Sequence, residues 1–480
     1  MEQQASNAAK PSFKLNYKRT FLIGFAFFGI LLLWQVYDSW CPTFLTELFT
    51  EALGEKDQTK VQYLVGIMMA LDNLAALILL PIFGHLSDKT HTRIGKRMPY
   101  ILVGTFVCAV AFPFIPVLFH FHNLAGVIAL MAIVVVFSMM YRNPAVSLMP
   151  DMTPKPLRSK ANGIINIMGY IGGAFATVVG IVFVLSTYLE DWSAGPSESR
   201  IWIIEAPFLI ASLLMLASAI VLFCTIKENK IAKEMEPEMK RGEEMAEVAD
   251  KVTDEAPLTK ANRTMLILIL AAEFFWFMAD NGIGTFMGNY TLYYLHCKTS
   301  GNMINTIVGG VGSVIGFAIG GYIASKIGRK WTIFTGLGIT GLALAIWAIL
   351  TFAIPVSVPA EGSYNSFPFY IFIIWGFKGF GMSLVHVNSY PMVVELCTGK
   401  KIGAYTGYYY AASMAAQTIT PIALGALLLA IGDSDAWKFL PIYAVSCLAI
   451  SFLIFLFVKN VKTSKTEFKM GLEGIGADED

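Results

Sequence analysis

The feature that most constrains this chain is a recurrence of long apolar runs. A helix needs about 20 mostly apolar residues to cross a bilayer, and a segment in lipid must satisfy its own backbone hydrogen bonds, as a helix does. Such runs lie near residues 20–46, 61–85, 98–119, 124–149, 161–188, 201–226, 263–295, 302–325, 331–355, 366–393, 402–431 and 437–458. The sequence therefore predicts an all-α membrane protein with twelve transmembrane helices.

Composition agrees with residence in lipid. Hydrophobic residues make up 56% of the 480 residues and charged residues only 14%, a balance that is not typical of soluble globules. A net charge of +1 gives no sign of nucleic-acid binding. The six cysteines form neither a disulfide framework nor a metal-ligand spacing, so no metal or cofactor is expected; they are Cys41, Cys108, Cys224, Cys297, Cys397 and Cys447.

Basic residues predict the orientation in the membrane. They gather after the second, fourth and eighth runs, at Lys89, Arg93, Lys96, Arg97, Lys155, Arg158, Lys160, Lys326, Arg329 and Lys330. Loops rich in Lys and Arg stay in the cytoplasm, so both termini are expected there, in a multi-pass protein of the cell membrane. Residues 1–19 lack a short apolar core with a small-residue cleavage site, and no removed signal peptide is expected.

A polar segment divides the chain into two halves. Residues 227–262 are rich in Glu and Lys and interrupt the apolar runs, so they are predicted to be a cytoplasmic linker. The linker would join a six-helix half at 20–226 to another at 263–458, with cytoplasmic tails at 1–19 and 459–480. A docking site for a regulatory partner is an alternative, but composition favours a solvated connector.

The two halves share sequence patterns. The string Trp-x3-Asp-x4-Thr-Phe begins at Trp34 and again at Trp276, and the segment from Gly84 to Lys89 is echoed from Gly321 to Lys326. Asp151 and Glu395 form a third echo, since each lies twelve residues before a glycine at a matching place. Tandem halves of one orientation are typical of carriers that bind substrate between the halves and alternate access to it.

With these motifs the chain resembles the major facilitator superfamily over essentially its whole length. The stretch from Gly84 to Tyr100, Gly-His-Leu-Ser-Asp-Lys-Thr-His-Thr-Arg-Ile-Gly-Lys-Arg-Met-Pro-Tyr, is similar to the glycoside–pentoside–hexuronide:cation symporter group, in the branch near the sucrose and maltose proton symporters. Asn143-Pro144 and the run from Met149 to Pro154 fit that branch too. The resemblance implies two six-helix halves, with the first helix of each three-helix unit lining a central cavity.

Charged residues at the ends of the runs predict a gate. Asp88 can pair with Arg97 or meet the positive end of the next helix, and Asp151 and Glu395 are expected to join such latches. The preference of basic residues for cytoplasmic loops explains the basic residues near Asp88, but it does not explain the acid itself. Glycine-rich stretches between Gly309 and Gly321 are interpreted as close helix contacts rather than a phosphate loop.

Charges inside the apolar runs fall on every third predicted helix. They are Asp38 on the first, Arg142 on the fourth, Glu273 and Asp280 on the seventh, and Lys378 with His386 on the tenth, and Asp72 is an addition on the second. An ionisable group in a membrane span faces a cavity, a partner or an ion path. Asp280 and Lys378 are predicted to form an ion pair, and Glu273 is expected to be permanently paired.

These residues suggest a site for a sugar and a proton. Sugars need carboxylates or amides for their hydroxyls and flat apolar surfaces for their C–H faces. The predicted substrate-binding residues are Trp34, Gln35, Tyr37, Asp38, Arg142, Trp276, Asp280, Lys378, His386, Asn388 and Gln417. Acids outnumber strong bases in this set, so a carboxylate is expected to carry the coupled proton; the candidates are Asp38, Asp72 and Asp280.

Two departures from related symporters affect the choice of cation. Melibiose-type sodium symporters have Asp-x3-Asp-Pro at a position where this chain has Ala76-x3-Leu80-Pro81. A hard cation needs several oxygen ligands, and these side chains provide none. A sodium site is therefore not expected. The positions that match the Asp and Arg of the plant sucrose symporters are Val135 and Val146. Proton coupling through that pair is therefore not expected.

The predicted function is proton-coupled symport of a neutral glycoside, such as maltose or sucrose, by a monomer. A proton-linked exporter of amphipathic compounds and a non-transporting membrane receptor are alternatives. An enzyme is not expected, because the chain has no nucleophile elbow, no His-Glu-x-x-His and no phosphate loop in an aqueous segment. The sequence leaves the sugar and the direction of transport open.

Overall fold

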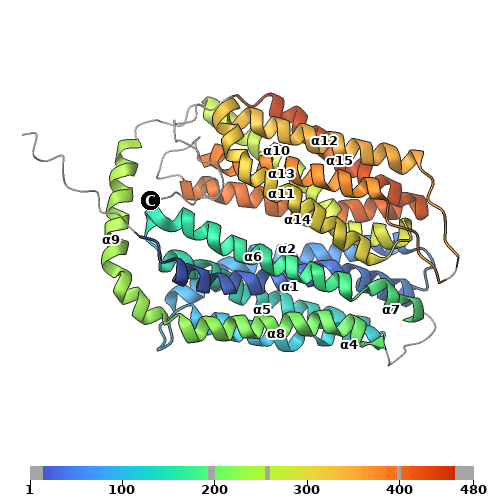
Figure 1. Cartoon of the computed structure of the whole chain (residues 1–480), viewed down its shortest axis with the longest axis horizontal. Helices are drawn as coiled ribbons and strands as arrows, with labels where there is room; N and C mark the ends of the chain where they lie inside the picture. The colour runs from blue at the N-terminus through green and yellow to red at the C-terminus, as the bar shows by residue number, and fades with distance from the viewer. Residues whose placement is uncertain are drawn as a thin grey trace, which may run out of the picture.

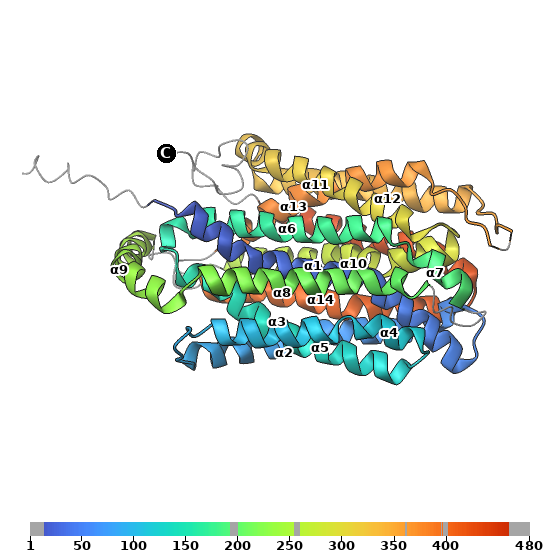
Figure 2. The same cartoon turned by 60° about the horizontal axis from the view of Figure 1, so that its bottom comes forward.

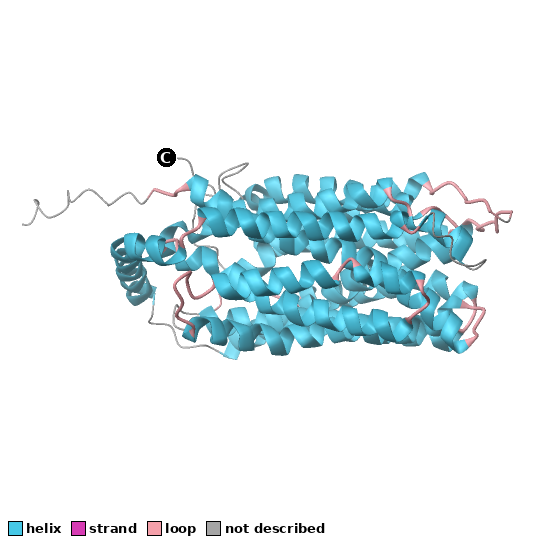
Figure 3. Cartoon of the chain, turned by 90° about the horizontal axis from the view of Figure 1, so that it is seen from below, coloured by secondary structure: helices cyan, strands magenta, loops and turns pink. Residues whose placement is uncertain are grey.

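The chain forms an elongated bundle of helices (Figures 1 and 3). The computed structural model describes residues 14–192, 200–253, 260–360, 362–394, 396 and 402–459. No β-strand occurs in these ranges beyond one isolated bridge between Cys297 and Asn365. The helices are α1 (Tyr17–Leu53), α2 (Gln62–Lys89), α3 (Met98–Ala111), α4 (Phe114–His120), α5 (Leu124–Asp151), α6 (Arg158–Val182), α7 (Leu185–Trp192), α8 (Trp202–Thr225), α9 (Glu228–Thr253), α10 (Lys260–Asn289), α11 (Thr299–Ile327), α12 (Arg329–Ala353), α13 (Phe369–Val394), α14 (Ile402–Ile431) and α15 (Phe439–Leu456).

Twelve of the helical segments in the described part of the chain are long and apolar enough to cross a membrane. They coincide with the twelve predicted runs, and the predicted fold class is confirmed. The first span is longer than its apolar run, because α1 continues to Leu53. Gly54 ends it in the left-handed conformation, with a φ of 63°, and its N–H bonds back to the last turn, as is typical of a helix C-terminus.

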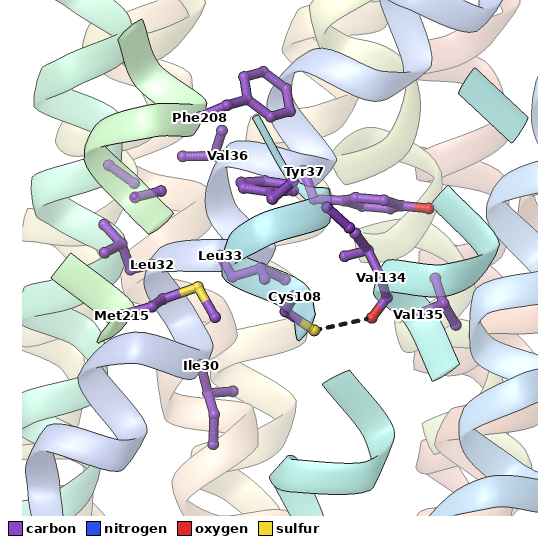
Figure 4. Packing of buried hydrophobic residues seen from close by; sticks show 14 of the residues in the cluster. Ile30, Leu32, Leu33, Val36, Tyr37, Cys108, Val134, Val135, Phe208 and Met215 are labelled. Atoms are coloured by element: carbon purple, nitrogen blue, oxygen red, sulfur yellow. Dashed lines mark hydrogen bonds between the residues drawn. The ribbon is translucent and has the colours of Figure 1, made fainter. Parts of the chain in front are cut away.

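The hydrophobic core consists of two clusters, one in each half of the chain. The first cluster is built from α1 to α8 and the second from α10 and α12 to α15. Figure 1 shows the two groups of helices side by side, and in the turned view of Figure 2 they partly overlap. In the first cluster, Val36 of α1 lies near Phe208 of α8 and Leu32 of α1 lies near Met215 of α8, whereas the Tyr37 ring extends away from α8 (Figure 4). Each half thus has its own packed core.

Glycines bring helices into backbone contact inside the second half. A Cβ added at Gly309 would meet Trp375 at 3.2 Å, and one at Gly312 would lie 2.2 Å from the carbonyl oxygen of Gly376. At Gly316 it would lie 1.8 Å from Ser383 Oγ. These glycines of α11 therefore allow close packing on α13, and the interpretation of this stretch as a helix contact is confirmed.

The bundle has two distinct ends. We call the end that holds α9, the start of α1 and the start of α10 the linker end, and the other the far end. Figure 1 shows the halves spreading apart toward the linker end. Between described residues of the two halves, the hydrogen bonds lie at the far end or midway along the helices. At the far end Asn289 of α10 accepts from Thr43 of α1 at 2.9 Å and donates to Gln62 of α2 at 3.0 Å.

The linker is helical over Glu228–Thr253, which form α9. Most described side chains of α9 are exposed, as expected for a solvated connector, but the prediction did not include a helix. Glu and Lys are good helix formers, and oppositely charged pairs one turn apart add stability. One such pair joins Lys240 to Glu236 at 2.8 Å. Local charge pairing therefore accounts for helix in a segment without a strong apolar pattern.

Candidate functional site

Asp38 lies inside the bundle and is open to solvent. Its side chain is exposed, whereas Cys41 and Pro42, on the same face of α1 toward the far end, are buried. Arg142 of α5 and Asp72 of α2 interact electrostatically with Asp38, so its side chain lies toward other helices and not toward lipid. Asp38 therefore borders a solvent-accessible space within the bundle, which we call the central cavity.

Asp280 occupies the equivalent position on α10 and forms the predicted ion pair. Its carboxylate Oδ1 lies 2.5 Å from Nζ of Lys378 on α13, with 37% of the Asp280 side chain and 17% of the Lys378 side chain exposed. The prediction of this pair is confirmed. His386 lies on the same helix as Lys378, interacts electrostatically with Asp280 and packs edge-on against Phe277 at 5.3 Å.

The charge arrangement is repeated in the first half in a looser form. Arg142 of α5, half-buried, interacts electrostatically with Asp38 but forms no ion pair with it in the described structure. The indole nitrogens of Trp34 and Trp276, one turn before each aspartate, are both buried without a hydrogen-bond partner. Each half therefore offers a carboxylate, a cation and an unsatisfied indole donor.

Asp72 adds an acid beside this set. One carboxylate oxygen of Asp72 is buried without a partner, and its closest electrostatic neighbours include Tyr37 and Asp38 of α1. The next residue, Asn73, donates to the carbonyl oxygen of Gln417 on α14 at 3.3 Å. Asp72 therefore lies next to the point where α2 meets the other half midway along the bundle.

Several predicted binding residues lie within packing in this conformation. Tyr37 and Trp276 are fully buried, and Asn388 is 1% exposed and donates to its own helix at Leu384. These three side chains are therefore buried in this conformation, and their part in substrate binding stays a prediction. Half-buried positions are occupied by Trp34, Gln35, Arg142, Lys378, His386 and Gln417, and Gln35 donates to Ser39 at 3.2 Å.

Glu273 differs from its expected state. The sequence predicts a permanent partner, but the side chain is fully buried and neither carboxylate oxygen has a hydrogen-bond partner. Glu273 is on the same face of α10 as Trp276 and Asp280, and that face continues into the contacts with α14 and α15. The expectation of permanent pairing is therefore wrong.

The predicted latch is present at the linker end. Arg97, 5% exposed, binds the carboxylates of Asp88 and Asp151 and donates to Ser87 at 2.5 Å. Burial, the largest single influence, would lower the pKa of Arg97, but the two ion pairs together outweigh it and raise that pKa. All of these residues belong to the first half, so the latch ties α2, α3 and α5 to one another. Glu395 lies outside the described residues.

The latch includes a residue that the sequence did not indicate. The carboxylate of Glu228, at the start of α9 and 4% exposed, accepts from the backbone N–H groups of Lys96, Arg97 and Met98 at 2.9 to 3.1 Å. Free N–H groups and the helix dipole favour an anion at a helix N-terminus. Glu228 therefore fixes the linker to the start of α3, although its sequence context is that of any solvated acid.

We expect Glu228→Gln to lower the free energy of unfolding by about 1–2 kcal/mol, because it removes the charge that caps α3. Thermal unfolding of the purified protein would measure this. Glu234→Gln is the matched control, since Glu234 is on the same helix, exposed, and 3.8 Å from Lys230. Equal melting temperatures for the two variants would contradict the capping role.

Within the described ranges, no group of three or more His, Cys, Asp or Glu side chains is placed to hold a metal ion. The chemistry available in the cavity is therefore that of carboxylates, cations, amides and aromatic rings. Such groups bind polar solutes and protons.

Comparison with known proteins agrees with this architecture. The sequence model described as Major Facilitator Superfamily matches residues 27–360 and 274–472. The chain belongs to the major facilitator superfamily. It is accordingly a multi-pass membrane transporter of a family whose members generally are not enzymes. None of the curated proteins matches the chain in sequence.

Solved structures share the fold at low sequence identity. A bacterial homologue of the human lysosomal transporter Spinster, in an inward-facing and occupied conformation, aligns with a TM-score of 0.62 and 13% identity over 93% of this chain and 97% of its own. A bacterial homologue of the iron transporter ferroportin, in an inward-facing state, has a TM-score of 0.62 and 13% identity over 92% and 99%. A point mutant of the nucleoside transporter NupG has a TM-score of 0.62 and 10% identity over 92% and 99%.

Proposed function

We propose that this transporter carries a neutral glycoside, such as maltose or sucrose, together with a proton. The observation that carries the proposal is the equivalent placement of Asp38 and Asp280, each open to solvent and each near a cation of the same half. An uncharged polyol is costly to desolvate unless its hydroxyls find such partners. The half-buried Trp34 and Gln35 offer an aromatic face and an amide beside Asp38.

The proposed orientation places the linker end in the cytoplasm. The basic loops at that end support this choice through the positive-inside rule, and both termini and the cell membrane as location follow from it. The far end, where Asn289, Thr43 and Gln62 join the halves, would then be the closed outer side. The conformation is thus proposed to be inward-facing, as in two of the similar solved structures.

The glycoside–pentoside–hexuronide:cation symporter group remains our proposal for the subfamily. Its support is the motif from Gly84 to Tyr100, whose Asp88 and Arg97 form an ion pair. The similar solved structures do not select a substrate, since their own ligands differ: one is a nucleoside transporter and another is a POT family transporter bound to 5-aminolevulinic acid. The sugar assignment therefore rests on the residues of this chain.

Coupling is proposed to arise from competition for the cavity acids. A proton, a cationic side chain or a sugar hydroxyl can approach each of Asp38, Asp72 and Asp280. A ligand that changes one of these contacts changes the affinity of the carboxylate for the others. The sodium slot offers only Ala76 and Leu80. An exporter of amphipathic compounds would need a mostly apolar cavity with a lone acid, so Arg142 and Lys378 count against that alternative.

Uptake by proteoliposomes tests this function. Purified protein is expected to concentrate labelled maltose or sucrose when the interior is alkaline, and to ignore a sodium gradient. The single variants Asp38→Asn, Asp72→Asn and Asp280→Asn are expected to reduce this accumulation. If all three still concentrate substrate, the coupling proposal fails, and uptake that follows only sodium would overturn the choice of proton.

A thermal-shift series with mono-, di- and trisaccharides would identify the sugar.

A further inference from the structure

Glu273 is the most isolated acid among the described residues of this bundle. Its side chain is fully buried, and both carboxylate oxygens are without a hydrogen-bond partner. By contrast, Asp280, two turns further along α10, has Lys378 at 2.5 Å. An unpaired carboxylate in such surroundings is strongly unfavourable, so the group takes up a proton or meets a cation.

Among the described residues of α14 and α15, no charged side chain is a partner of Glu273. On α14, Tyr409 and Tyr410 interact with it electrostatically, but the Tyr409 hydroxyl is already bonded to Ser389 at 2.9 Å. On α15, Ser451 donates to the carbonyl oxygen of Ala272, and Tyr443 and Cys447 interact with each other.

The charged groups of the remaining neighbouring helices have interaction partners other than Glu273. Lys378 and His386 of α13 interact with Asp280, and Asp38 of α1 interacts with Arg142. No neighbouring cation is therefore available to neutralise this carboxylate in the described structure.

A metal cation does not fit this position. Sodium-like and calcium-like hard cations take several oxygen ligands, and no group of His, Cys, Asp or Glu able to hold a metal is present in the described ranges. A proton needs only one carboxylate oxygen. We propose that Glu273 is a proton-binding site of this transporter and is a neutral carboxylic acid in this conformation.

This inference deepens the proposed function, since it rests on proton coupling and names a fourth acid. The step is a simple proton binding, in which a proton from water forms an O–H bond with one carboxylate oxygen and returns to water on release. In the C-terminal half, the Asp280 carboxylate lies 2.5 Å from Nζ of Lys378 whereas Glu273 has no such partner, so the two acids of α10 take separate roles. Asp280 meets the substrate region, and Glu273, nearer the linker end, stores the proton.

Infrared spectroscopy of the purified protein tests the protonation without any substrate. The C=O band of protonated carboxylic acids, identified by its shift in D2O, is expected in the native protein at neutral pH and is expected to be weaker in Glu273→Gln, in which Asp38 and Asp72 are still present. The band is expected to persist in the double variant Asp280→Asn/Lys378→Gln, which removes the other acid of α10 together with its cation. An unchanged band intensity in Glu273→Gln, or a decrease in the double variant alone, would overturn the assignment.

A transport measurement separates this inference from the parent proposal. Glu273→Gln is expected to keep exchange of labelled for unlabelled glycoside but to lose accumulation driven by a pH gradient, because glutamine mimics the protonated acid and cannot release a proton. If Glu273→Gln proves unstable, Glu273→Leu serves in its place, since an apolar side chain suits an unpaired buried position. Full accumulation by a folded variant would overturn the role of Glu273, whereas absence of uptake by the native protein would overturn the parent function alone.

Discussion

Asp280→Asn is expected to abolish glycoside uptake and to destabilise the protein. The substitution leaves the ammonium group of Lys378, 17% exposed, without the carboxylate that lies 2.5 Å away. Removing one partner of a fully buried ion pair costs about 3–5 kcal/mol. Because solvent reaches 37% of the Asp280 side chain, we expect the loss of unfolding free energy near or below the lower end of that range. Thermal unfolding and proteoliposome uptake measure the two effects.

A double-mutant cycle separates the structural role of the pair from its role in transport. Asp280→Asn/Lys378→Gln is expected to regain most of the stability, since no uncompensated charge remains, but not the uptake. Glu236→Gln is the matched control, because Glu236 pairs with Lys240 at 2.8 Å on the surface of α9, and we expect it to leave uptake unchanged. Native-like uptake by the double variant would contradict the participation of Asp280 and Lys378 in transport.

This ion pair illustrates what the sequence could predict. Opposite charges in apolar spans must find partners, and only Lys378 lies at a comparable depth to Asp280, so their pairing followed from position alone. The twelve spans followed in the same way from the length of the apolar runs. The two constraints are the cost of an unpaired charge in a membrane span and the length that a helix needs to cross the bilayer. Both can be read from the positions of residues along the chain.

The rotation of a helix about its axis is what the sequence could not provide. Tyr37 is next to the exposed Asp38, yet it points into packing and is fully buried. Trp276 is one turn from Asp280 and is also buried, since the face that they share passes from the cavity into a helix interface. Aromatic and amide side chains are favourable in either place, so residue type alone does not distinguish lining from packing.

Contacts between distant segments were also beyond the sequence. Glu228 lies in a run of Glu and Lys where most described side chains are exposed, and only the fold brings it to the start of α3. The missing partner of Glu273 is a similar case. The sequence shows an acid in a span, but whether a cation meets it depends on which helices surround that level of the bundle.

The packing of α2 against α14 leads to a second prediction with a large effect, at the seam between the halves near the far end. A Cβ at Gly66 would lie 2.1 Å from the carbonyl oxygen of Pro421, and a Cβ at Gly425 would lie 2.6 Å from that of Gln62. These are backbone atoms, which cannot move aside as a flexible side chain would. The two helices therefore touch only because both positions lack a side chain.

Gly66→Ala is expected to open the far end of the transporter. Overpacking of this kind costs about 1–3 kcal/mol, and the cost falls only on the conformation in which α2 and α14 touch. A free-energy difference of this size shifts the equilibrium between the two conformations by about 5- to 150-fold. Uptake is expected to fall, because the closed outer side is needed in every transport cycle.

Distances between spin labels measure this opening. In a background that lacks the exposed Cys224, labels at Lys56→Cys and Ser434→Cys report the separation of the short helices Gln58–Val61 and Ser434–Lys438, which are in contact at the far end. Gly66→Ala is expected to add a population with longer distances. Gly310→Ala is the matched control, since a Cβ at this glycine of α11 meets nothing within 4 Å. Identical distance distributions for the two variants would show that the contact of α2 with α14 does not hold the far end closed.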